Sequence, residues 1–97
     1  SAITTSQLSR MECRCQPIRQ SNMPLLALYD TFFAGRDLQV SEVDGRVIDE
    51  ATEIRAKFNL KSPDAIHLAA ATVAKAAVFL TGDKQLARFV GIPVEVI

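Results

Sequence analysis

Residues 61–83, KSPDAIHLAAATVAKAAVFLTGD, decide the fold that this sequence predicts. Ser62 is a favourable N-cap, because its hydroxyl can accept a hydrogen bond from a free N–H of the first helical turn. Pro63 suits the first helical position, where no intrahelical N–H is needed. Asp64 then falls in the first turn, where the helix dipole favours a carboxylate. The segment therefore predicts a helix of small residues that begins with an acidic side chain.

A buried strand and an acidic turn follow this helix. The run 77–81, AVFLT, is apolar without alternation, which is typical of a strand covered on both faces. Asp83 follows at the carboxyl end of that strand, the edge where open α/β sheets bind ligands. The sequence thus predicts that Asp64 and Asp83 are held at one edge of a sheet by rigid elements.

The composition limits the class of protein. The chain has 97 residues, 48% apolar and 23% charged, which is typical of one small folded domain. Its 11 basic and 11 acidic residues cancel, so bulk charge does not indicate a nucleic-acid partner, although a local patch or a metal ion could attract one. Cys13 and Cys15 are two apart, a spacing that disfavours a disulfide within a helix. We therefore expect reduced cysteines and a cytoplasmic protein, and no run is long enough to span a membrane.

The remaining segments predict helices that separate short strands. The expected elements are a helix over about 6–18, a second that starts at Ser21 or Asn22 and ends just before Gly35, a strand at 38–40, a helix between caps Asp44 and Asn59, a short helix at 84–89 and a strand at 92–97. Helices that alternate with short buried strands favour a three-layer α/β/α fold around a short parallel sheet of three strands. Such a sheet usually has a strand before its first helix, so we expect a further strand upstream of Ser1.

Two of these helices leave alternatives open. The first has apolar residues at helical spacing, Leu8, Met11, Cys15 and Ile18, and this stripe is expected to face the core. Glu12 borders the stripe and is either a solvated side chain or part of a site. The second helix is apolar nearly all round over residues 25–33. It is either enclosed within the domain or it binds a partner, such as a second copy of the chain.

Three acidic residues that are far apart in the sequence, Glu12, Asp64 and Asp83, fall where the carboxyl edge of a sheet could gather them. Several carboxylates stay ionised together only around cations. Oxygen ligands favour Mg²⁺ or Mn²⁺, and a water bound to such an ion can attack phosphorus. The alternative is that the acidic residues at helix starts are ordinary caps.

Three segments, TTSQLSRMECRCQPIR, SPDAIHLAAA and FLTGDKQLARFVGIPVEVI, together resemble PIN domains, and most nearly the VapC-like toxin ribonucleases of VapBC-type toxin–antitoxin pairs. The resemblance implies a Mg²⁺- or Mn²⁺-dependent endoribonuclease, a hydrolase with an antitoxin partner. It also implies that Glu12, Asp64 and Asp83 are catalytic metal ligands and that Thr81 positions a water or a phosphate. The family has a further aspartate at the end of an N-terminal strand, and no residue here corresponds to it. The chain is therefore expected to be a single PIN-like domain over 1–97 that lacks its N-terminal strand, binds metal weakly and cleaves poorly.

Other polar residues near the predicted site have two interpretations each. His67 lies one turn after Asp64 and is either a ligand or a hydrogen-bonded structural histidine. The cations beside the acidic residues either contact RNA phosphates or are solvated; they are Arg10, Arg14, Arg19, Lys84 and Arg88. A different class of function is also open, in which the domain is a non-catalytic binding module that acts through its second helix.

Overall fold

The computed structural model describes residues 3–81 and 84–96. Its elements, in chain order, are β1 (Ile3–Ser6), α1 (Gln7–Arg19), α2 (Met23–Phe33), β2 (Leu38–Ser41), α3 (Gly45–Phe58), α4 (Ser62–Val73), β3 (Phe79–Thr81), the 3₁₀-helix η1 (Lys84–Arg88) and β4 (Val94–Val96). Asp83 lies outside the described residues, so the role expected of it stays a prediction.

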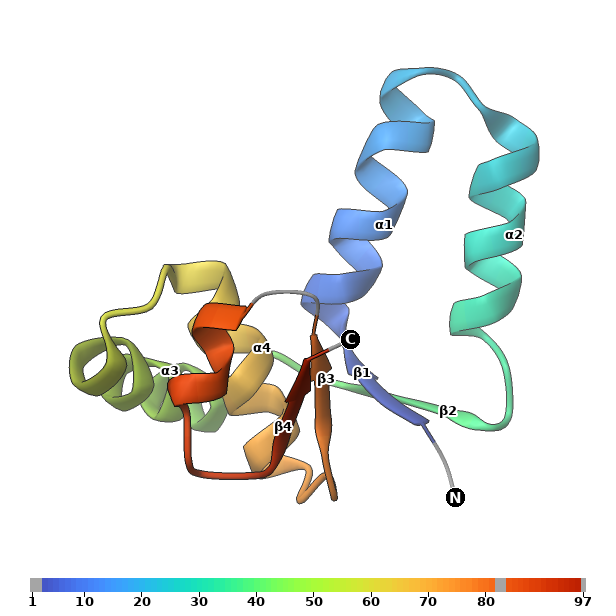
Figure 1. Ribbon diagram of the computed structural model, residues 1–97. Coiled ribbons are helices and arrows are strands. Elements are labelled where there is room, and N and C mark those ends of the chain that lie inside the picture. The colour runs from blue at the N-terminus through green and yellow to red at the C-terminus, as the bar shows by residue number, and fades with distance from the viewer. Residues whose placement is uncertain (1–2, 82–83, 97) are drawn as a thin grey trace.

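The strands lie between two pairs of helices. Figure 1 shows the α1–α2 hairpin on one side of the strands and the α3–α4 pair on the other. The buried core lies mainly on the second side, where α3 packs along α4. Its members are Val47, Ala51, Ile54, Leu60, Ala65, Leu68, Ala69, Ala70, Leu86 and Phe89. The prediction of a mixed α/β fold with short parallel strands is confirmed.

The strands pair differently from the prediction. β1 pairs with β2 and β3 pairs with β4, both in parallel, so the described residues form two sheets of two strands each. The expectation of one sheet of three strands is therefore wrong in the number of sheets and in the number of strands. Parallel pairing itself is confirmed, and it follows from the helical connections that join each pair.

The expected element order was wrong at its start, because β1 precedes the first helix within the chain. Ile3, Thr4 and Thr5 are β-branched and stand before the helix cap Ser6, a signal that the helical pattern after it concealed. β1 is thus a strand before the first helix within the chain itself, and the expectation of a strand upstream of Ser1 stays a prediction.

Short-range capping chemistry sets most helix ends where the sequence predicted them. Asp44 caps α3 by accepting from the Val47 N–H at 3.1 Å, and Asn59 ends it in the left-handed conformation, with φ 54° and ψ 45°. The predicted Ser62 cap of α4 is wrong by one residue. The Ala65 N–H bonds to the Lys61 carbonyl at 3.0 Å, so Lys61 is the cap and Ser62 the first helical residue.

The apolar stripe of α1 faces solvent and not the core. Met11 is 61% exposed and Ile18 53% exposed, and Cys15 is exposed as well. The buried residue of α1 is Pro17, on another face of the helix. The prediction of a buried stripe was wrong because periodicity shows that a helix has an apolar face but not what covers that face.

Candidate active site

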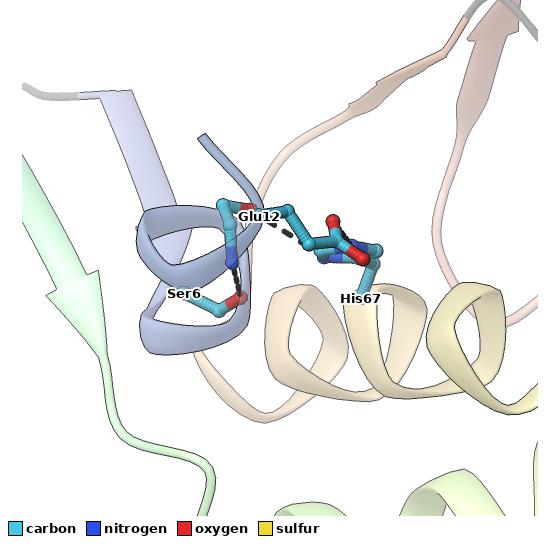
Figure 2. Close-up of polar contacts among 4 residues, drawn as sticks. Ser6, Glu12 and His67 are labelled. Atoms are coloured by element: carbon cyan, nitrogen blue, oxygen red, sulfur yellow. Dashed lines mark hydrogen bonds and ion pairs between the residues drawn. The ribbon is translucent and has the colours of Figure 1, made fainter. Parts of the chain in front are cut away.

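Glu12 and His67 meet across the contact between α1 and α4. The Glu12 carboxylate Oε1 lies 2.8 Å from His67 Nε2, and the side chains are 46% and 20% exposed, respectively. Figure 2 shows the two side chains pointing toward one another from their separate helices. These residues are 55 positions apart in the sequence. The fold therefore brings the predicted glutamate to the helix that has the predicted aspartate in its first turn.

A short series of hydrogen bonds fixes the His67 ring. Ser6, which is buried, ends β1 and accepts from the Ser9 N–H at 3.3 Å, so the first turn of α1 is held in place. The Ser9 hydroxyl lies 3.4 Å from His67 Nδ1. Because the Glu12 carboxylate can only accept, His67 Nε2 carries the proton between them. Both ring nitrogens are thus engaged, and the prediction that His67 is hydrogen-bonded is confirmed.

Ser9 is a site residue that sequence reasoning missed. It lies one turn before Glu12 on α1, and residues three apart share a helix face. This spacing could have identified Ser9 from the sequence, because a side chain that contacts Glu12 on this helix face also lies within reach of Ser9. The same spacing separates Asp64 from His67 on α4, so the two helices each present a pair of polar residues.

Asp64 lies in the first turn of α4, as the sequence predicted, and it is half-buried. Thr81 ends β3 and is half-buried as well. The structure thus brings one predicted catalytic residue, Glu12, into contact with α4. It places another, Asp64, in the first turn of the same helix. Asp83, the third, lies outside the described residues.

The donor chemistry of the described carboxylates suits a hard divalent cation. Glu12 and Asp64 provide oxygen ligands, which Mg²⁺ and Mn²⁺ prefer over nitrogen and sulfur. Within residues 3–81 and 84–96, however, no three His, Cys, Asp or Glu side chains lie together as a group that could hold a metal ion. The two described carboxylates are therefore the kind of ligand that such an ion prefers, but they are too few to hold it. Further ligands would have to complete its coordination.

The predicted phosphate-binding cations differ in their surroundings. Arg14 Nε bonds to the Asp30 carboxylate at 2.8 Å, which links α1 to α2. Arg88 Nε donates to a backbone carbonyl of its own 3₁₀-helix at 3.1 Å. Lys84 is exposed, and Arg10 is half-buried and borders the exposed stripe of α1. Arg14 therefore has a structural contact, which any role in binding RNA would have to share.

Glu12 and His67 also border a large open cleft. The cleft has a volume of about 870 Å³ and runs from β1 to the residues that lead into β3. Helix α1 contributes Glu12 and Cys13 to its lining, and α4 contributes His67. The candidate active site is thus open to a ligand from this side.

The Cys13 thiol is expected to be the less reactive of the two cysteines. Burial, and secondarily the Glu12 carboxylate, raise the pKa of Cys13 above its ordinary value, so less thiolate is present at neutral pH. Iodoacetamide followed by mass spectrometry should label exposed Cys15 first, and Cys13 labelling should accelerate only as pH rises through its raised pKa. Glu12→Gln should lower that pKa and speed Cys13 labelling. Equal labelling of both thiols in the folded chain would contradict this prediction.

The comparison with known families identifies the chain. The family model described as PIN domain matches residues 1–92. The chain therefore belongs to the PIN domain family, whose members are generally nucleases that act on RNA and typically use divalent metal ions. No curated protein and no solved structure matches the chain significantly. Among the described residues, no helix has both the length and the apolar character that crossing a membrane requires.

Proposed function

We propose that this protein is a Mg²⁺- or Mn²⁺-dependent endoribonuclease that hydrolyses RNA phosphodiester bonds, as the VapC-like toxin of a toxin–antitoxin pair. The observation that carries the proposal is the Glu12–His67 contact, at 2.8 Å. It brings a carboxylate from α1 onto the helix that carries Asp64 in its first turn, in a chain that belongs to a family of nucleases.

In this proposal Glu12, Asp64 and Asp83 are the catalytic metal ligands. A bound divalent ion would lower the pKa of a water molecule and stabilise the charge that develops on the phosphate. His67 has a positioning role, because it holds the Glu12 carboxylate and is itself held by Ser9. Thr81, at the end of β3, would position a water or a phosphate oxygen beside the ion.

Substrate RNA would be bound by its phosphates, which are the features that cations recognise without regard to sequence. Arg10 and Arg14 extend from the same helix as Glu12, and Lys84 begins η1. These three side chains are the proposed phosphate contacts.

The exposed apolar residues of α1 and α2 support a protein partner. Leu28 is 68% exposed and Phe32 53% exposed, and Met11, Ile18 and Met23 are exposed on the same hairpin. We assign this surface to a homodimer contact and to a helix of an antitoxin, because an amphipathic helix can place its apolar face in such a surface. The free thiols of Cys13 and Cys15 support a cytoplasmic location for the pair.

The direct test is RNA cleavage with and without metal. The chain should cleave RNA slowly with Mg²⁺ or Mn²⁺, and EDTA should stop cleavage while the circular dichroism spectrum stays unchanged, because the metal supplies chemistry and not the core. Cleavage that continues in EDTA would contradict the proposed metal dependence.

The alternative is a non-catalytic PIN-like binding module. It is favoured by the exposed apolar surface of α2, none of whose residues is buried. Absence of cleavage under every metal condition, together with a stable complex formed through α2, would establish this alternative.

A further inference from the structure

The charge of the chain is unevenly distributed, although its total is zero. Residues 54–63 and 84–94 contain five of the 11 basic residues and none of the 11 acidic residues. Within α3 the acidic residues end at Glu53, and the last turn has Arg55 and Lys57. If the fold brings these two segments together, a neutral chain acquires a local positive field.

Core packing does bring the two segments together. Phe58 of α3 and Phe89, which follows η1, meet edge to face with their ring centroids 5.3 Å apart. The Arg55 guanidinium donates to the Leu60 carbonyl at 3.0 Å, which ties the end of α3 to the chain that enters α4. Leu86 of η1 is buried in the same core, and Figure 1 shows η1 (orange-red) beside the α3–α4 pair. The end of α3, the start of α4 and η1 therefore meet at one corner of the domain.

Four side chains of this corner are exposed cations. We call them the cationic corner; they are Lys57, Lys61, Lys84 and Arg88. Both ion pairs within residues 3–81 and 84–96 include a side chain of α1, so no described carboxylate pairs with the cationic corner. A cation is unfavourable at the N-terminus of a helix, so Lys61, the N-cap residue of α4, does not stabilise that helix by its charge.

The cationic corner adjoins the candidate active site. Asp64 lies one turn after Lys61 at the start of α4. On α1, by contrast, Arg14 bonds to the Asp30 carboxylate at 2.8 Å, so a phosphate would have to displace that carboxylate. The cationic corner offers phosphates a positive surface without this competition from a described carboxylate.

We propose that the cationic corner binds phosphates of an RNA strand and leads that strand to Asp64. The identity of the ligand rests on the proposed function, and the new element is the path of the substrate over the end of α3, the start of α4 and η1. Binding of this kind is driven by the release of counterions from the phosphates, so it depends strongly on salt and little on sequence.

The test measures RNA binding separately from cleavage. A fluorescent oligouridine is titrated with the Asp64→Asn variant in EDTA, and anisotropy gives its affinity at several salt concentrations. Each lost phosphate contact should weaken binding about fivefold at about 0.1 M salt and reduce the slope of log K against log salt by about 0.7. Oligoadenosine should lose affinity by the same factor. The substitutions are made one at a time in the Asp64→Asn background; they are Lys57→Gln, Lys61→Gln, Lys84→Gln and Arg88→Gln.

Matched controls lie at the opposite ends of the same helices. Lys75→Gln, just beyond α4, and Arg46→Gln, in the first turn of α3, remove the same charge from exposed positions. The 12 residues of α4 span about 18 Å, whereas salt at about 0.1 M screens charges beyond about 10 Å. Both controls should therefore keep the affinity and the salt slope. If they weaken binding as much as the corner variants do, affinity follows net charge alone and the cationic corner is overturned.

Stability separates a binding role from a structural one. Lys61→Gln should leave the melting temperature unchanged or raise it, because it removes a cation from a helix N-terminus. In a form of the protein that cleaves RNA, Lys61→Gln should raise KM and leave kcat unchanged, since a phosphate contact is made equally in the ground state and the transition state. A fall in kcat at unchanged KM would overturn the role in substrate binding.

Failure of the cationic corner and failure of the proposed function give different results. If RNA binds and all four corner variants bind it as tightly as Asp64→Asn alone, the cationic corner is wrong and the proposed function stands. If the unchanged chain neither binds RNA nor cleaves it with Mg²⁺ or Mn²⁺, both are wrong.

Discussion

Asp64→Asn is expected to lower metal-dependent RNA cleavage by at least about a hundredfold in kcat/KM, which corresponds to about 2.7 kcal/mol of transition-state stabilisation. The substitution keeps the size of the side chain but removes the negative charge that, in the proposed function, would bind the cation. Asp64 lies in the first turn of α4 and is half-buried, away from the core of that helix. Loss of activity should therefore occur without loss of the fold. The measurement is the rate at which a labelled RNA is cleaved in saturating Mg²⁺. The variant is compared with the unchanged protein, in a form that shows metal-dependent activity.

Glu12→Gln should have a comparable effect on cleavage, with an additional signature at His67. The neutral amide of this variant has no charge to hold the imidazole, so the histidine resonances should shift in NMR spectra even when metal is absent. Asp64→Asn should leave the His67–Glu12 contact in place, since Asp64 makes no part of it. The two variants thus test separate contributions to one site.

Matched controls are available on α3. Asp49→Asn and Glu53→Gln make the same chemical changes on exposed positions of a helix that faces solvent there. Both controls should cleave RNA at the rate of the unchanged protein. If Asp64→Asn and Glu12→Gln also retain full activity, the catalytic roles assigned to these two residues are wrong, even though the chain belongs to a family of nucleases.

The parts of the fold that the sequence predicted well are those that depend on neighbouring residues. The limits of α3 follow from Asp44, which bonds to the Val47 N–H, and from Asn59, which tolerates the left-handed conformation. Both effects act within one helical turn, so the sequence contains all that is needed to locate them.

The errors concern what lies beside each element. The stripe of Met11 and Ile18 has the correct helical spacing, yet it is exposed, because the core that α1 could have joined is built by α3 and α4. β1 was missed for a related reason, since a strand of four residues owes its existence to its pairing with β2. Sequence spacing fixes the period of an element, but the partner that covers it is a property of the whole chain.

The site shows the same division. The resemblance to PIN domains picked out Glu12 and Asp64 by their motifs, and their helices are present. The contact between Glu12 and His67 joins residues 55 positions apart, so no local pattern contains it. It depends on how α1 crosses α4, which is settled by packing.

Leu68→Ala is expected to destabilise the folded state by about 2–5 kcal/mol, which is the usual cost of truncating a fully buried leucine. Leu68 is 0% exposed and lies in the middle of α4, where α3 and η1 residues complete the core. A domain of this size has a total stability of roughly 5–15 kcal/mol, so the change removes a large part of it. Urea unfolding followed by circular dichroism measures the difference directly.

Leu28→Ala is the matched control, since it makes the same truncation on α2 at a side chain that is 68% exposed. At protein concentrations where the chain is a monomer, it should change the free energy of unfolding by less than about 0.5 kcal/mol. If the two variants are equally destabilised under these conditions, the buried core around Leu68 is not the main source of stability. Leu68 also follows His67 directly on α4, so a cavity there loosens the helix that presents both His67 and Asp64. Leu68→Ala should therefore lower cleavage even at temperatures where the chain stays folded, whereas Leu28→Ala should leave it unchanged.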